Sequence, residues 1–427
     1  MTITIFIGSL LAAMAIGVPI AFALLLCGAA LMWQLNMLDA QILAQNVING
    51  ADSFPLLAVP FFMLAGEVMN AGGLSRRIVN LSMALVGHVK GGLGYVTIVA
   101  ACIMAALSGS AVADAAALSA LLLPMMKAAG HKPERSAGLI ASAGIIAPII
   151  PPSIAFVVFG VAGNVSITKL FLAGVFPGLM LGASLWVTWW WLSRREDVTP
   201  PPRKTAAEVW QALIDSFWAL GLPFIIVFGL KFGFFTPTEA AVVAAVYAIL
   251  VSTLVYRELN LRSLMPLFVA AAKTSAVIML LVAASMVSAW LITVAQIPAQ
   301  VVSLLTPMLD DPKTLMVAIM VLVMIVGTAL DLTPTILLLT PVLIPVVKAA
   351  GIDPVYFGVL FVINNAIGLI TPPVGTVLNT VAGVGGMRLD AVTRGVVPFM
   401  CAQFFVMFLL VMFPDLVMVP ARWMIGH

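Results

Sequence analysis

Two stretches of this chain carry the same prolines, glycine and lysine at one constant separation. Pro124 in the first stretch recurs as Pro345 in the second, 221 positions later, and the register holds without a gap. Eight identities share it, and in the first stretch they are Pro124, Lys127, Ala128, Ala129, Gly130, Pro133, Pro151 and Pro152. A unit duplicated in this way predicts two copies of one supersecondary structure.

The composition places both copies in a membrane. Hydrophobic residues make up 63% of the 427 positions, charged residues 9%, and the mean hydropathy is +1.18. The apolar runs are too long and continuous for barrel strands, and an open sheet edge cannot be satisfied in lipid, so we expect an all-α polytopic membrane protein. Crossings are predicted at 3–33, 54–71, 135–163, 170–192, 218–235, 237–256, 264–296, 355–382 and 396–419. The run at 3–33 is expected to be a retained first helix rather than a signal peptide.

Two further apolar stretches, 94–127 and 313–348, are too long for one crossing and are interrupted halfway. The first interruption is Ser108-Gly109-Ser110, here called the first tip. The second, from Gly327 to Pro334, is called the second tip. This pattern predicts two re-entrant helical hairpins.

A proline-rich helix follows each predicted hairpin. The first carries Ala147 to Ser153 and the second carries Asn364 to Thr376, here called the first and second breaks. Proline removes an amide donor, so carbonyl groups become free at membrane depth, which is tolerated beside a cavity. We therefore predict two discontinuous helices; the alternative is a kinked helix with a structural role only.

The positions of Lys and Arg predict the orientation. Fourteen of the 20 lie in loops within 76–90, 127–135, 194–204, 257–262 and 388–394, and five lie in the opposite set of loops. Cytoplasmic loops are enriched in these residues, so the N-terminus is predicted to be cytoplasmic and the C-terminus periplasmic. The two hairpins then open to opposite sides. This predicts inverted repeats at 1–192 and 237–427, joined by a cytoplasmic linker and an inverting helix at 193–236.

Duplicated units with broken helices are typical of secondary transporters, whose coupling ions bind unwound backbone near the bilayer midplane. Small and hydroxylated residues at the tips leave carbonyl oxygens pointing inward, which suits sodium. The first predicted sodium site consists of Ser108, Gly109, Ser110, Pro148, Pro151 and Ser153. The second consists of Gly327, Thr328, Asp331, Asn364, Gly368 and Thr371. The predicted substrate site consists of Ser110, Asp114, Pro152, Thr333, Asn365, Pro373, Gly375 and Thr376. No organic cofactor is expected.

Asp114 and Asp331 are the acidic residues predicted to lie closest to the membrane centre. Charges there are expensive and mark functional sites by default. The alternative is that each complements the dipole of the returning hairpin arm. A different role is predicted for Glu239, because Thr236-Pro237-Thr238-Glu239 has the pattern of a capping box with proline at the first helical position.

Catalytic chemistry is not expected. All three histidines fall in predicted loops or the tail, so none lies in the membrane to act as a base for Ser108 or Ser110. The chain has no Gly-x-Ser-x-Gly elbow and no phosphate-binding glycine loop. The sequence predicts a protein that is not an enzyme.

Several motifs together resemble the large membrane subunit of tripartite ATP-independent periplasmic (TRAP) transporters. They are Phe61 to Glu67, Leu107 to Asp114, Ala147 to Ser153, Phe235 to Ala240, Asp331 to Pro334 and Ile370 to Pro373. The resemblance spans nearly the whole chain, and among sugar-acid members it is similar to the diketogulonate type. It implies a sodium-coupled importer of small carboxylates in a bacterial inner membrane, working by elevator movement.

The same resemblance implies two partners, a small four-helix membrane subunit and a soluble periplasmic substrate-binding protein. The small subunit is expected to be a separate protein, since this chain starts directly at the large-subunit pattern. Two alternatives remain open. One is a stand-alone sodium/anion symporter that needs no binding protein, and the other is an anion channel.

Overall fold

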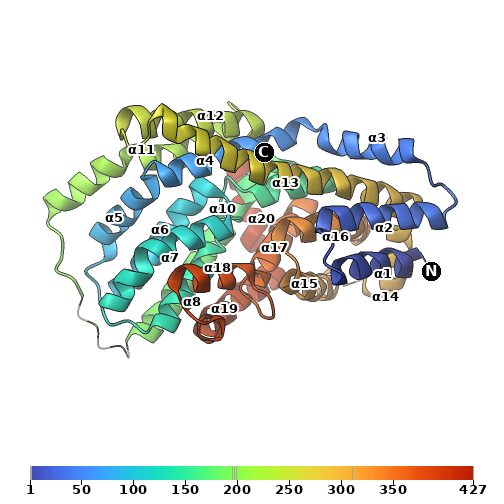
Figure 1. Ribbon diagram of the computed structural model, residues 1–427. Helices are drawn as coiled ribbons and strands as arrows, with labels where there is room; N and C mark the ends of the chain where they lie inside the picture. The colour runs from blue at the N-terminus through green and yellow to red at the C-terminus, as the bar shows by residue number, and fades with distance from the viewer. Residues whose placement is uncertain (1, 195, 197, 199, 310, 427) are drawn as a thin grey trace.

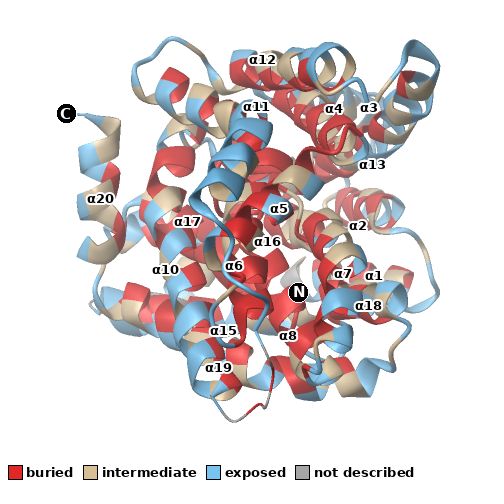
Figure 2. Ribbon diagram, turned by 90° about the vertical axis from the view of Figure 1, so that its left-hand side faces the viewer, coloured by how far each residue is buried: buried red, intermediate tan, exposed pale blue. Residues whose placement is uncertain are grey.

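The chain is helical, and no strand occurs among the residues that the structure describes (Figure 1). This computed structural model describes residues 2–194, 196, 198, 200–309 and 311–426, without the side chains of residue 3 and residues 304–309. Within that part, nine helices are long and apolar enough to cross a membrane, judged by length and composition. Buried positions gather on the faces that the helices turn to one another (Figure 2). The predicted all-α class is confirmed.

Both predicted hairpins are present. The first is α6 (Gly92–Ser108) and α7 (Ala111–Ala128), and the second is α15 (Pro312–Ala329) and α16 (Leu332–Ala349). Gly109 turns the first tip with φ +62°, in the left-handed region that glycine tolerates. The duplicated sequence therefore folds into duplicated hairpins.

Both predicted discontinuous helices are also present. The first is α8 (Pro133–Gly144) and α9 (Ile154–Gly163), and the second is α17 (Pro354–Gly368) and α18 (Thr376–Gly385). Helix α17 stops inside the second break, whereas α8 ends at Gly144, just before the first, so residues 145–153 and 369–375 have no regular helix. The peptide bonds Pro151–Pro152 and Pro372–Pro373 are both cis, so the two copies match in backbone detail.

The two copies interlock instead of lying side by side. Helix α18 packs on α7, and α16 packs on α9, so the second half of each broken helix contacts the hairpin of the other copy. The Lys127 ammonium adds a polar link between the copies by donating to the Gly385 carbonyl oxygen at 3.0 Å, at the end of α18. The repeat boundaries themselves, 1–192 and 237–427, stay a prediction.

Two long helices flank this interlocked unit. They are α10 (Ile167–Ser193) and α19 (Leu389–Met412), and α19 crosses α8 where both helices carry glycine. A Cβ atom on Gly395 would lie 1.8 Å from the Glu134 carbonyl oxygen, and one on Gly138 would lie 2.3 Å from the Gly395 backbone. The two backbones approach closely because neither glycine carries a side chain.

Other helices pack around that unit. They are α3 (Ala40–Ala51), η1 (Phe54–Leu57), α4 (Ala58–Ala71), α5 (Leu74–Val86), α11 (Ala206–Lys231), α12 (Pro237–Leu250) with the π turn η2 (Val251–Val255), α13 (Leu261–Val294), α14 (Ile297–Leu309) and α20 (Asp415–Ile425). The capping box predicted before α12 is confirmed, because the Glu239 amide donates to the Thr236 hydroxyl at 3.3 Å and the Thr236 amide donates to the Glu239 carboxylate at 2.8 Å.

The prediction of one crossing at 3–33 is wrong. The chain forms two helices there, α1 (Thr2–Ala15) and α2 (Ile20–Gln34), which pack against each other. Gly17 adopts φ +84° and Pro19 precedes α2, so together they turn the chain back. Figure 1 shows α1 and α2 side by side.

Three smaller differences concern helix ends and unpredicted helices. Helix α11 begins at Ala206, earlier than the crossing predicted at 218–235, and the crossing predicted at 396–419 is divided between α19 and α20. Two helices that were not predicted, α3 and α14, pack against α13. Arg195, one of the loop charges used to predict orientation, lies outside the described residues.

Candidate functional site

The first tip rests on the first break. A Cβ atom on Gly109 would lie 2.5 Å from the Pro152 carbonyl oxygen, so only glycine permits this approach. Beyond Gly109, Ser110 caps α7, and its hydroxyl accepts from the Ala113 amide at 3.4 Å. The structure therefore places the first tip against Pro152, which lies between the predicted sodium ligands Pro151 and Ser153.

The residues of the first break are held by their own hydrogen bonds. The Ser153 hydroxyl caps α9, accepting from the Phe156 amide at 3.1 Å, and donates to the Pro148 carbonyl oxygen. Ser153 has no exposed surface, and Pro151 is buried. The Ser153 hydroxyl donates once and accepts once, so it keeps one lone pair.

Asp114 lies behind the first tip in the first turn of α7. Only 1% of the residue is exposed, and the Ser108 hydroxyl donates to its Oδ1 atom. The Ser110 amide also donates to the Ser108 oxygen at 3.2 Å, so the carboxylate organises the tip through Ser108. The Oδ2 atom of Asp114 is buried and has no hydrogen-bond partner in the described structure. A substrate role and a dipole role for Asp114 both stay predictions.

The second tip also packs closely, in this case against α17. A Cβ atom on Gly327 would lie 2.6 Å from the Asn365 Oδ1 atom, and one on Gly368 would lie 2.8 Å from the Gly327 carbonyl oxygen. The Asn365 amide nitrogen donates to the Leu332 carbonyl oxygen at 3.1 Å, which crosses from α17 to the start of α16. The Asn365 Oδ1 atom is buried and makes no hydrogen bond to a described residue.

Asn364 and Asn365 therefore have different surroundings, although both are buried. The Asn364 side chain donates to the Met320 carbonyl oxygen at 2.6 Å, about two turns of α15 before Gly327. It ties α17 to α15 and lies apart from the second tip. Asn365 is the one of the pair that the structure places at the tip.

The second break is more open than the first. Pro372, Pro373 and Val374 are exposed, whereas Pro151 and Pro152 are buried. Asp331 is exposed as well, and the Thr376 hydroxyl lies 3.5 Å from its Oδ1 atom. Access to the predicted substrate residues is therefore easier on the side of the second tip.

Two predicted hydroxyl ligands of the second sodium site donate hydrogen bonds to backbone carbonyl groups of their own helices. Thr328 donates to the Ile325 carbonyl oxygen and Thr371 donates to the Ile367 carbonyl oxygen, each at 2.8 Å. Thr333 lies half-buried in the first turn of α16, and Gly375 turns the chain into α18 with φ +52°. A hydroxyl that donates in this way still keeps a lone pair for a cation.

Each tip therefore has one buried side-chain oxygen with no hydrogen-bond partner among the described residues, Oδ2 of Asp114 and Oδ1 of Asn365. Buried polar atoms in native structures are normally satisfied, so such an atom calls for an explanation such as an ion or a water molecule. Carboxylate and amide oxygens are ligands that hard cations prefer. The donor set fits a sodium ion, and no group of three His, Cys, Asp or Glu side chains that would suit a transition metal occurs in the described part.

Sequence reasoning missed Gln403 on α19. Its side chain is fully buried, and Nε2 donates to the Ser142 carbonyl oxygen at 2.9 Å near the end of α8. The bond anchors the helix that leads into the first break. The available signal was a lone glutamine inside an apolar run, because polar side chains at membrane depth need partners.

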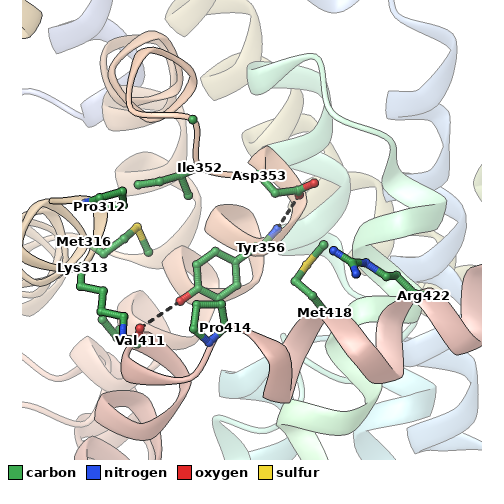
Figure 3. A pocket seen from close by; sticks show the side chains of 11 residues that line it. Pro312, Lys313, Met316, Ile352, Asp353, Tyr356, Val411, Pro414, Met418 and Arg422 are labelled. Atoms are coloured by element: carbon green, nitrogen blue, oxygen red, sulfur yellow. Dashed lines mark hydrogen bonds between the residues drawn. The ribbon is translucent and has the colours of Figure 1, made fainter. Parts of the chain in front are cut away.

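A separate cavity of about 250 Å³ lies where α15 begins and α19 gives way to α20 (Figure 3). Lys313, Asp353 and Arg422 line it, and the Tyr356 hydroxyl beneath it donates to the Leu410 carbonyl oxygen at 2.9 Å. It contains no residue of either tip, and Asp353 is committed to capping α17. We do not assign it to the site.

Comparison with known proteins gives a consistent result. Residues 7–416 match the family described as Tripartite ATP-independent periplasmic transporter, DctM component. The 2,3-diketo-L-gulonate TRAP transporter large permease protein YiaN of Escherichia coli K12 is 56% identical, over 99% of this chain and 100% of its own. The sialic acid TRAP transporter large permease protein SiaM of Vibrio cholerae is 36% identical, over 96% of each chain.

A solved structure shares the fold. The YdaH transporter of Alcanivorax borkumensis aligns with a TM-score of 0.64 over 92% of this chain and 91% of its own, at 15% sequence identity. The curated relatives named above are transporter permeases. The family match along nearly the whole sequence, together with these relatives, shows that the chain belongs to the DctM family and is the large permease subunit of a TRAP transporter.

Proposed function

We propose that this permease imports a small organic anion, a carboxylate or sugar acid, by coupling its movement to sodium. The observation that carries the proposal is the pair of buried oxygens without hydrogen-bond partners in the described structure, one on Asp114 at the first tip and one on Asn365 at the second. Two equivalent hairpin tips, each with a free oxygen, suit two related cation sites. Relatives named for 2,3-diketo-L-gulonate, sialic acid and C4-dicarboxylates support an organic acid as the substrate.

The two cation sites are expected to be related but unequal. At the first tip the ligands would come from Ser108 to Ser110, from carbonyl groups of the first break and from Asp114. At the second tip they would come from Gly327, Asn365 and the carbonyl groups freed between Gly368 and Thr371. Because the second tip and break are more exposed, we expect the substrate to enter beside Thr376 and Asp331.

Alternating access is proposed to occur by elevator movement of the interlocked hairpins and broken helices. Their cross-packing, α18 on α7 and α16 on α9, supports movement of the two copies as one body. The permease would lie in a bacterial inner membrane, with its N-terminus cytoplasmic and its C-terminus periplasmic. It would work with a small four-helix membrane subunit and receive the anion from a periplasmic binding protein.

Uptake by proteoliposomes that contain both membrane subunits tests this function. With the binding protein and 2,3-diketo-L-gulonate outside, an inward sodium gradient should drive accumulation, and an equal potassium gradient should not. Accumulation that is unchanged without sodium would remove the coupling from the proposal.

Two arms of the same assay test the alternatives. If uptake persists when the binding protein is omitted, the permease is a stand-alone symporter. If electrical recording finds an anion conductance that does not depend on sodium, it is a channel.

A further inference from the structure

A polar cavity of about 660 Å³ lies between α5 and α11, and none of its lining residues belongs to either hairpin. The two helices pack together beneath it, where the Ser216 hydroxyl donates to the Arg77 carbonyl oxygen at 3.0 Å. The Tyr256 hydroxyl fixes the same corner by donating to the Asp215 carbonyl oxygen at 2.9 Å. These hydrogen bonds close the bottom of the cavity, and α5 and α11 form its two walls.

The α5 wall is basic. Arg76 and Arg77 both pair with Glu258, at 2.9 Å and 2.6 Å, so two guanidinium groups share one carboxylate. Arg77 also lies over the ring of Tyr256, 3.7 Å from its centroid, which holds it in place. Arg76 keeps 61% of its side chain exposed and has N–H donors to spare. This wall carries one positive charge that no described carboxylate balances.

The α11 wall carries one excess negative charge when its charged side chains are counted in the same way. Lys204 and Glu208 pair with each other at 2.7 Å and cancel. The Asp215 carboxylate accepts from the Gln211 side-chain amide at 2.9 Å and makes no ion pair with a described residue. One negative charge therefore faces the cavity opposite the excess positive charge of the α5 wall.

The cavity lies at the level where a membrane would meet water. Helix α11 has 26 residues, so it is about 39 Å long, whereas the hydrocarbon core is about 30 Å thick. The charged residues Glu208 and Asp215 lie in its first three turns, so this end extends into the head-group region. Trp210 and Phe217, 64% and 63% exposed, lie near this end of α11 on the face opposite the cavity, and tryptophan is typical of this level.

We propose that this cavity binds the head group of a zwitterionic glycerophospholipid with a primary ammonium. The phosphate would lie on the wall of Arg76 and Arg77, and the ammonium would donate to the Asp215 carboxylate. A head group with a phosphate and no cation would leave Asp215 facing a negative charge, so the arrangement favours the zwitterion.

Native mass spectrometry of the full chain in detergent, titrated separately with phosphatidylethanolamine and phosphatidylglycerol of identical acyl chains, tests this assignment. The wild type should retain phosphatidylethanolamine with about fivefold higher affinity, the size expected for one partly exposed charge pair. Asp215→Asn, which keeps the shape and removes the charge, should abolish that preference. Arg76→Gln should weaken both lipids about fivefold, because both carry the phosphate.

Arg262→Gln is the matched control, an exposed arginine at the start of α13 that does not line the cavity. It should leave both affinities unchanged. Equal affinity of the wild type for the two lipids would overturn the proposal, and so would a preference that survives Asp215→Asn. An Arg262→Gln effect as large as that of Arg76→Gln would show general charge attraction instead of a site. Because Asp215→Asn is nearly isosteric, the test does not depend on the fold of the arginine variant.

Discussion

The Ser108 hydroxyl donates a hydrogen bond to the buried carboxylate of Asp114, and this bond spans the first hairpin tip from the end of α6 to the first turn of α7. The contact joins the last residue of α6 to the fourth residue of α7. The same carboxylate keeps its second oxygen free. Asp114 therefore shapes the tip and has capacity to bind a cation.

Replacing Asp114 should separate these two roles. Asp114→Asn keeps an acceptor for Ser108 and removes the charge, so it should fold normally but need about tenfold more sodium for half-maximal uptake. Asp114→Ala also leaves the Ser108 hydroxyl unpaired and should lower the melting temperature. Uptake in proteoliposomes and a thermal-shift assay in detergent measure the two effects. Ser119→Ala, which removes a buried hydroxyl without a described partner from the same helix, serves as the control and should change neither.

Adding a methyl group at Gly327 should disturb the second tip. A Cβ atom there would lie 2.6 Å from the Asn365 Oδ1 atom, so the amide must move from its position. We expect Gly327→Ala to lower sodium-driven uptake about 100-fold, because displacement of a ligand by about 1 Å is costly. Gly383→Ala is the matched control, since a Cβ atom at Gly383 meets nothing within 4 Å. Equal uptake by the two variants would contradict a role for this contact.

The crossing of α8 and α19 should not accept a side chain at Gly395. A Cβ atom there would lie 1.8 Å from the Glu134 carbonyl oxygen, which is backbone and cannot rotate away. Gly395→Ala should destabilise the protein by about 3 kcal/mol, seen as a lower melting temperature in detergent. Gly8→Ala, on an open face of α1, should leave the melting temperature unchanged or raise it slightly.

A buried ion pair outside the predicted spans should make stability depend on pH. Burial alone would raise the pKa of Glu196. The hydrogen bond and charge of His131, 2.8 Å away, oppose this, and so do those of Arg135. Together they hold the pKa of Glu196 below its ordinary value of 4.5. A depressed carboxylate pKa stabilises the folded state above the ordinary value. That contribution is lost as the pH falls through the folded pKa.

The melting temperature of the wild type should therefore fall more steeply than that of Glu196→Gln as the pH is lowered below about 4.5. At neutral pH the wild type should be the more stable of the two, because the variant lacks the charge that pairs with Arg135. Glu134→Gln, an exposed carboxylate at the start of α8, should follow the wild-type curve. Parallel curves for the wild type and Glu196→Gln would contradict the prediction.

The repeated pairs Pro151-Pro152 and Pro372-Pro373 were enough to predict both breaks, because a missing amide donor acts on the backbone where it occurs. Both hairpins were predicted from the polar interruptions at the two tips, whereas Pro124 and Pro345 lie inside α7 and α16 without ending them. The resemblance carried by Leu107 to Asp114 likewise predicted the family that the comparisons show. The same reasoning gave one helix at 3–33, because the apolar run hid the turn at Gly17 and Pro19.

The sequence by itself determined where the helices break and which residues stand at each tip, since proline, glycine and hydroxyl side chains act locally. Only the tertiary structure decided which of those residues meet. Asn364 and Asn365 are adjacent in sequence, yet one bonds to Met320 along α15 and the other reaches the second tip. Lys127 likewise bonds across to Gly385 in the other copy. Such pairings depend on how helices distant in sequence pack together. Residue spacing within one segment does not determine that packing.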